Sequence, residues 1–85
     1  MEIVFHKNFK KRFVKLPLKI QRQFYQRLEL FLANKFDKTL NNHSVGKVFP
    51  DCRSINVTGD YRAIFYDQGE AVIFITVGSH ANLYE

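Results

Sequence analysis

The sequence has little of what several common protein classes require. Only one of its 85 residues is a cysteine, so no disulfide can form within the chain. The chain also has no tryptophan. No run of apolar residues approaches the roughly 20 that a membrane-spanning helix needs. The four glycines lie apart, at positions 46, 59, 69 and 78, which excludes a glycine-rich phosphate-binding loop. The length fits a single domain, residues 1–85.

Metal-binding and thiol chemistry are also disfavoured. His6, His43 and His80 are far apart and have no pair of cysteines near them, so we expect no metal site and no other cofactor. We interpret Cys52 as a small packing residue rather than a nucleophile. Polar residues follow Met1–Phe5 at once, which is unlike a signal peptide, and we expect a cytoplasmic protein that does not bind membranes.

What the chain has in excess is positive charge. Its formal net charge is +5, with 13 Lys and Arg against eight Asp and Glu, and it is unevenly distributed. Nine of the basic residues but only two of the acidic ones lie before position 36. A basic surface of this kind favours a polyanion or an acidic protein as partner, although an ordinary solvated helix surface explains it equally well.

Two amphipathic helices are predicted in the first half of the chain, after a short strand at residues 2–5. Asn8 is a suitable cap for the first helix, and Pro17 follows its end. The second helix runs from Pro17 to about Phe36, because apolar residues recur there at helical spacing. These apolar positions are Ile20, Phe24, Leu28 and Phe31. We expect the two helices to form a hairpin.

Three strands are predicted in the second half, where the apolar period changes to two. They cover residues 53–57, 61–66 and 71–77, with turns between them. Residues 34–47 are interpreted as a polar loop, Gly78 as the end of the last strand and residues 79–85 as a tail. The predicted fold class is α+β, in the order β-α-α-β-β-β, with the helical hairpin packed on one face of a small, mostly antiparallel sheet.

Two short segments carry side chains that are suited to catalysis: residues 59–62 and residues 78–84. Within a sheet, Arg62 and His80 can lie at neighbouring positions on one surface. A guanidinium binds phosphate oxygens bidentately, and an imidazole transfers protons near neutral pH. Tyr84 lies four residues after His80 and can stack on a base. This set suits RNA cleavage by attack of a ribose 2′-OH on its own phosphate, although Arg62 and His80 are more often surface residues in such positions and Tyr84 can simply pack on the sheet edge.

The ending Val77-Gly78-Ser79-His80-Ala81-Asn82-Leu83-Tyr84, the segment Gly59-Asp60-Tyr61-Arg62 and the basic helices resemble the RelE/ParE superfamily of bacterial type II toxins. Within that superfamily the ending is similar to that of the YafQ-like ribonucleases, and the resemblance covers nearly the whole chain. It implies an mRNA interferase that usually cuts codons in the ribosomal A site. It also implies mRNA, the ribosome with its 16S rRNA and a cognate acidic antitoxin as partners.

The resemblance assigns roles to single residues. His80 matches the catalytic histidine of the YafQ branch, the expected general acid, and Tyr84 stands at a functional aromatic position. Asp60 and Tyr61 match the Asp–aromatic pair that this branch has on the strand turn. His43 falls where this branch has another functional histidine.

The remaining roles come from RelE-type members. Arg62 matches the arginine that is expected to hold the scissile phosphate, and Lys47 resembles a basic loop residue. Asn56 departs from the YafQ pattern, which has a histidine there, so the group that activates the 2′-OH stays open between His43, Asp60 and Lys47. Further RNA contacts are expected from the basic residues Lys10, Lys11, Arg12 and Arg53.

Two other functions remain open. A ParE-like toxin of the same fold acts on DNA gyrase and has no nuclease activity, but ParE-type chains generally lack the histidine–aromatic ending. A non-enzymatic module, in which the basic helices merely hold nucleic acid, also fits the charge distribution.

Overall fold

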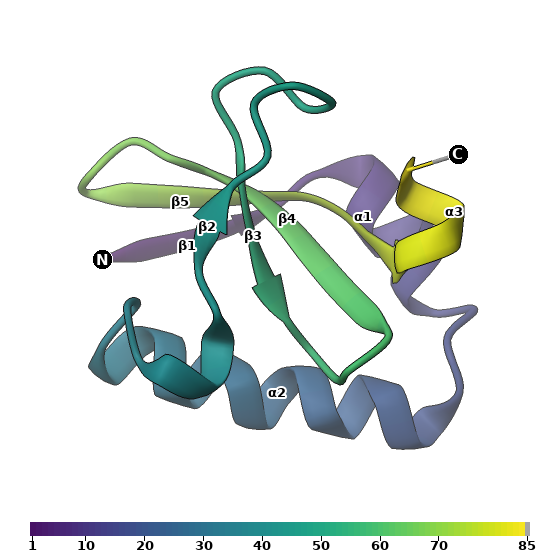
Figure 1. Cartoon of the computed structure of the whole chain (residues 1–85). Helices are drawn as coiled ribbons and strands as arrows, with labels where there is room; N and C mark the ends of the chain where they lie inside the picture. The colour runs from purple at the N-terminus through teal and green to yellow at the C-terminus, as the bar shows by residue number, and fades with distance from the viewer. Residues whose placement is uncertain (85) are drawn as a thin grey trace.

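The computed structural model describes residues 1–84 and has a five-stranded sheet at its centre, with the spatial order β1-β5-β4-β3-β2 (Figure 1). The strands are β1 (Glu2–Phe5), β2 (His43–Ser44), β3 (Arg53–Asn56), β4 (Tyr61–Asp67) and β5 (Ala71–Ser79). The helices are α1 (Lys7–Phe13), α2 (Leu18–Ala33), the 3₁₀ helix η1 (Lys38–Leu40) and α3 (His80–Tyr84). The predicted α+β class is confirmed. The sheet is mixed, because β1 runs parallel to β5 while the other neighbours are antiparallel.

The first helix differs from its prediction at its start. His6, rather than Asn8, is the cap of α1, and its Nδ1 atom accepts a hydrogen bond from the backbone N–H of Asn8 at 3.0 Å. The two helices pack against each other, and the ring centroid of Phe13 on α1 lies 5.4 Å from that of Phe24 on α2. α1 lies beside β5, whereas α2 runs along the sheet on its helix-covered face (Figure 1).

Three predicted boundaries in the second half are wrong. The expected loop at residues 34–47 contains η1, which Asp37 caps, and the short edge strand β2. Gly78 does not end the last strand, since β5 continues to Ser79. The expected tail is the short helix α3, which turns away from the end of β5.

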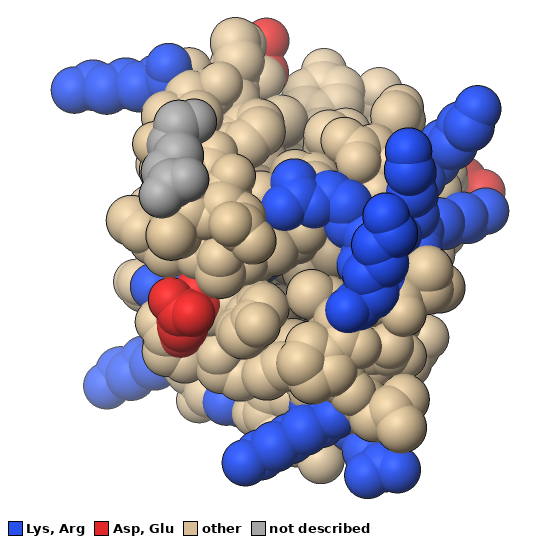
Figure 2. Space-filling model, turned by 90° about the vertical axis from the view of Figure 1, so that its right-hand side faces the viewer, with Lys and Arg blue, Asp and Glu red and all other residues tan. Residues whose placement is uncertain are grey.

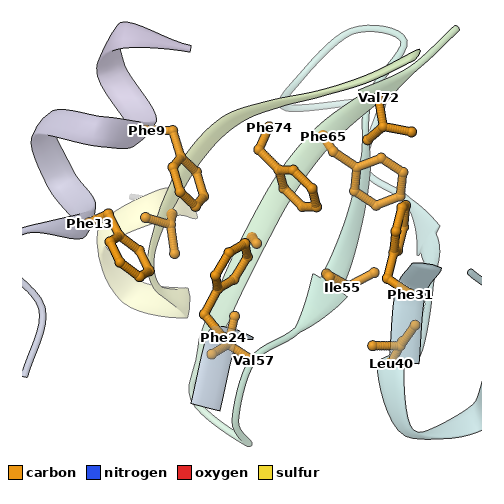
Figure 3. Close-up of a cluster of buried hydrophobic side chains, with 12 residues drawn as sticks. Phe9, Phe13, Phe24, Phe31, Leu40, Ile55, Val57, Phe65, Val72 and Phe74 are labelled. Atoms are coloured by element: carbon orange, nitrogen blue, oxygen red, sulfur yellow. The ribbon is translucent and has the colours of Figure 1, made fainter. Parts of the chain in front are cut away.

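The core between the helices and the sheet is built from phenylalanine rings (Figure 3). Phe74 on β5 is fully buried at its centre, with the ring centroids of five other phenylalanines within 5.5–5.8 Å. These rings belong to Phe5, Phe9, Phe24, Phe31 and Phe65. The helical apolar spacing predicted the contribution of α2 correctly, because Phe24 and Phe31 are both buried there.

A second, smaller cluster covers the opposite face of the sheet. Its buried members are Cys52, Ile64 and Leu83, from the 45–52 segment, β4 and α3 respectively. Burial raises the pKa of the Cys52 thiol, and the nearby Asp51 raises it further. A thiol of this kind is a poor nucleophile, which agrees with the predicted packing role. This cluster supports α3 and thereby the end of the chain that carries His80.

A β-bulge decides which side chains of β5 face which side. Ile64 pairs with Thr76 while Phe65 pairs with Phe74, so Ile75 is an extra residue in β5. Because side chains alternate along a strand, one extra residue exchanges the two faces for everything that follows it. As a result Gly78 faces the same side of the sheet as its partner Arg62.

One ion pair joins the segment after α2 to the end of β4. Lys35 donates a hydrogen bond to Asp67 at 2.7 Å, and this bond is the main reason why the pKa of Asp67 is lowered. A carboxyl with a lowered pKa stabilises the fold above its unfolded pKa, and the gain is lost as the pH falls through its folded pKa.

Asp67→Asn is therefore expected to reduce the free energy of unfolding at pH 7 by up to about 1 kcal/mol, as for other partly exposed pairs. Denaturant titrations of wild type and variant should converge at acidic pH. Glu70→Gln, an exposed carboxylate on the next turn, should change little. A difference between Asp67→Asn and wild type that stays constant down to low pH would contradict this assignment.

Candidate active site

A cleft of about 680 Å³ lies on the face of the sheet that carries α3. It brings together five of the residues that the sequence singled out, from three separate parts of the chain. These are His43 and Lys47 near β2, Arg62 on β4, and His80 and Tyr84 on α3. The cleft is open to solvent, and basic and imidazole side chains line it together with apolar ones.

Arg62 lies in the middle strand of this region. Its direct cross-strand partners are Asn56 on β3 and Gly78 on β5. The guanidinium is half-buried and folds back onto the β3–β4 turn, where Nη1 donates to the carbonyl oxygens of Gly59 at 2.8 Å and Thr58 at 3.1 Å. Within residues 1–84 these bonds occupy Nη1 alone, so Nε and Nη2 remain available to an anion.

His80 and Tyr84 are held together by α3. Residues four apart share one face of a helix, and the two ring centroids lie 4.7 Å apart. The backbone N–H of His80 donates to the carbonyl oxygen of Asp60 at 2.8 Å, which fixes the start of the helix against the β3–β4 turn. Phe49 supports Tyr84 from the other side in an edge-on contact at 6.1 Å. The imidazole itself is exposed to the cleft.

The tautomer of His43 follows from its hydrogen bond. Its Nδ1 lies 2.7 Å from the carbonyl oxygen of Asn41, which can only accept. Nδ1 therefore carries a proton, and in the neutral ring Nε2 is the free acceptor. Asn41 has a positive φ of 48°, a conformation that asparagine tolerates better than most residues. A neutral His43 is thus ready to accept a proton.

The other predicted site residues lie outside the cleft. The side chain of Asp60 is exposed on the turn, and its contribution to the geometry comes from its backbone carbonyl. Arg53 bonds to Asn42 at 2.7 Å and covers the Phe36 ring. Tyr61 packs partly against the helix-side core.

Nor does the structure bring the three basic residues of α1 into this cleft. Lys10 and Lys11 are exposed on the helix, whereas Arg12 is half-buried beside the end of β5.

Several lining residues had no signal in the sequence. Asn41, Ser44 and Val48 line the cleft because η1 and β2 fold back along β3. Beneath the site, the buried side-chain oxygens of Ser54 and Asn56 have no hydrogen-bond partner within residues 1–84. Asn56 lies directly opposite Arg62 and can accept a bond from a guanidinium that moves away from the turn.

Across residues 1–84, no group of three or more His, Cys, Asp or Glu side chains is placed to hold a metal ion. In the same part of the chain, no helix is both long and apolar enough to cross a membrane.

The comparison with protein families shows to which family the chain belongs. The family model described as "ParE toxin of type II toxin-antitoxin system" matches residues 3–84. The chain belongs to the RelE/ParE superfamily of type II toxins. No curated protein matches the sequence.

Solved structures of RelE/ParE toxins have the same fold as this chain. YafQ from E. coli has a TM-score of 0.81 at 20% identity, over 99% of this chain and 98% of YafQ. A YoeB/ParE toxin from Agrobacterium tumefaciens has a TM-score of 0.77 at 10% identity, over 94% and 99% of the two chains. The RelB-RelE complex from Methanococcus jannaschii gives 0.76 at 22% identity, over 95% and 94%. The predicted RelE-like fold is thus confirmed, and the likeness extends over essentially the full length.

Proposed function

We propose that this toxin is a metal-independent endoribonuclease that cleaves mRNA, in the ribosomal A site. The observation that carries the proposal is the convergence of His43, Arg62, His80 and Tyr84 on one open cleft from distant parts of the chain. Transfer of a phosphoryl group to a neighbouring hydroxyl needs an acid, a base and a group that stabilises negative charge, and two imidazoles and a guanidinium supply them. A toxin without such chemistry has no evident use for this convergence.

Each residue has a defined task in the proposed reaction. Nε2 of His43 accepts the proton of the ribose 2′-OH, and the 2′-oxygen forms a bond to the adjacent phosphorus. Arg62 donates to the phosphate oxygens while negative charge builds on the phosphorane. The bond from phosphorus to the 5′-oxygen breaks, and protonated His80 donates its proton to that oxygen. Tyr84 stacks on a base and orients the nucleotide. The products are a 2′,3′-cyclic phosphate and a 5′-hydroxyl.

The direct test is to incubate the toxin with ribosomes that are translating a defined mRNA and to map the new ends. We expect cuts that leave a 2′,3′-cyclic phosphate and a 5′-hydroxyl. Intact mRNA would sink the proposal. Ends with a 3′-hydroxyl and a 5′-phosphate would contradict the mechanism, because 2′-OH attack cannot produce them.

His43→Gln tests the assignment of the base. Wild-type cleavage should show a bell-shaped pH profile, because it needs one neutral and one protonated imidazole. The variant should lose the limb on which the rate rises with pH. Its rate should fall by about 10²-fold, the low end for general base catalysis, since solvent can also accept the proton. Single-turnover rates across pH measure both effects.

Thr39→Ala is a suitable control for this variant, since Thr39 is exposed on η1 close to the same loop. It should keep the wild-type profile. If His43→Gln retained both limbs, the base would have to be another group, with Lys47 in the cleft as the next candidate.

We also propose that an acidic antitoxin silences the protein. The solved DinJ-YafQ and RelB-RelE complexes are toxin–antitoxin assemblies of this fold. The net charge of +5 supports an acidic partner, since complementary charge speeds association and favours the complex.

The second candidate function is inhibition of DNA gyrase, which the ParE name of the matching family model favours. It predicts that purified toxin blocks DNA supercoiling and leaves mRNA intact. Under this hypothesis His80→Ala should have little effect on toxicity. A supercoiling assay beside the mRNA assay, with the same protein preparations, therefore separates the two functions.

A further inference from the structure

A second polar cleft lies at the edge of β5, beyond the point where β1 ends. Its volume is about 340 Å³, and it is separate from the candidate active site. α1, the connection to α2, and α3 surround it. Figure 2 shows this side of the molecule, where Lys and Arg side chains gather beside a tan surface with few charges. The residues with polar or charged side chains that line the cleft are Arg12, Lys15, Tyr61, Ser79 and Asn82.

Arg12 is built into this cleft rather than attached to its rim. The guanidinium is half-buried and approaches the backbone of Gly78 so closely that a Cβ atom there would lie 2.7 Å from Nη2. Nη1 lies 3.5 Å from the hydroxyl of Thr76. Lys10 and Lys11, its neighbours on α1, are instead exposed to solvent. The missing side chain at Gly78 therefore gives Arg12 its place.

Among residues 1–84, no acidic side chain pairs with the positive charge in this cleft. Within residues 1–84 the observed ion pair joins Lys35 and Asp67, at the far end of β4, so Arg12 and Lys15 are uncompensated. Leaving a half-buried guanidinium without a counter-charge costs free energy, which an anionic ligand can recover. Ser79 adds a donor, because its oxygen accepts from the backbone N–H of Asn82 and its own proton stays free.

We infer that this cleft binds a second phosphate of the substrate RNA, next to the one that is cleaved. Two clefts flank the same junction: Ser79 lines one and His80 the other, while Tyr61 lines one and Arg62 the other. An RNA strand held at His80 thus presents a neighbouring phosphodiester to Arg12 and Lys15. A guanidinium fork and an ammonium match the oxygens of a phosphodiester. This inference rests on the proposed function, since it places the same RNA strand.

The experiment measures binding of a ten-nucleotide RNA whose riboses are all 2′-O-methylated, so that no 2′-OH attack can occur. Arg12→Gln should weaken binding about tenfold and should flatten the slope of log K against log salt by about 0.7, the value for one single-strand phosphate. Lys15→Gln should flatten the slope by a similar amount. Arg22→Gln removes the same charge from an exposed site on α2 and should leave the affinity for the oligonucleotide unchanged.

Gly78→Ala provides an independent variant without any change of charge. The new Cβ displaces the Arg12 guanidinium but leaves its charge, so affinity should fall by less than in Arg12→Gln. The double variant should lose no more than Arg12→Gln alone. Equal affinity and equal slope for wild type, Arg12→Gln and Lys15→Gln would overturn the inference. If Arg12→Gln did not fold by circular dichroism, Lys15→Gln and Gly78→Ala would still decide it.

Three further arms separate the alternatives. If Arg12→Gln lowered retention on empty ribosomes but not oligonucleotide affinity, the phosphate would belong to ribosomal RNA and the inference would be wrong. It would also be wrong if only antitoxin affinity fell, because the cleft would then bind a carboxylate. If Arg12→Gln bound the oligonucleotide more weakly but the wild type cut no mRNA, the proposed function would be wrong. The cleft would still be a phosphate-binding site.

Discussion

Replacing His80 with alanine is expected to reduce the single-turnover rate of mRNA cleavage by about 10³- to 10⁴-fold, the upper part of the range for general acid–base catalysis. Without His80 the 5′-oxygen must leave as an unprotonated alkoxide. The loss should be chemical rather than structural, because the imidazole is exposed and the hydrogen bond to Asp60 uses only the backbone of His80. Alanine also favours the helical conformation that α3 needs.

An RNA with sulfur in place of the 5′-bridging oxygen separates a general acid from a positioning role. A thiolate leaves without a proton, so His80→Ala should cleave this RNA at close to the wild-type rate. His6→Asn is the matched control, because it removes a histidine outside the cleft while asparagine can still cap α1. Failure of the sulfur substrate to restore the rate would show that His80 does not protonate the leaving group.

The parts of the fold that the sequence predicted well are those set by local periodicity. The spacing of Phe24 and Phe31 placed both on the buried face of α2, and both are buried. The change to a period of two located the three long strands within a few residues. In each case the residues that determine the element are neighbours along the chain, so the pattern is visible without the rest of the fold.

The misplaced elements depend on contacts between distant residues. The bulge at Ile75 arises from the way β5 pairs with β4, where Ile75 has no partner residue. The apolar pattern of β5 alone does not reveal this. α3 spans five residues and has little stability alone. Leu83 holds it by packing beside Ile64 and Cys52. Both features decide how Gly78 and His80 are presented to the cleft.

The candidate site shows the same division. Arg62 and His80 were expected on neighbouring positions, and they line one cleft because β4 and β5 are adjacent strands. The sequence could not show that the side chain of Asp60 is exposed and that only its backbone carbonyl bonds to His80. The free Nε2 of His43 was equally hidden, because it depends on one bond to Asn41.

Arg62→Ala is expected to lower the cleavage rate by about 10²- to 10³-fold, as does the loss of other groups that stabilise a transition-state charge. Arg62→Lys should recover only part of this, because an ammonium supplies charge but not the paired donors of a guanidinium. Arg27→Ala is a matched control: Arg27 also donates to a backbone carbonyl, that of Val57 at 3.3 Å, but it lies on α2 outside the cleft.

The loss should appear mainly in kcat rather than in KM. In the free protein Nη1 of Arg62 already bonds to the carbonyl oxygens of Thr58 and Gly59. While Nη1 stays on the turn, a ground-state phosphate is bound by Nε and Nη2 alone, so the net gain on substrate binding is small. The phosphorane carries more negative charge and draws the guanidinium more strongly, which makes the interaction specific to the transition state. A variant that raised KM tenfold or more at constant kcat would instead assign Arg62 to uniform RNA binding.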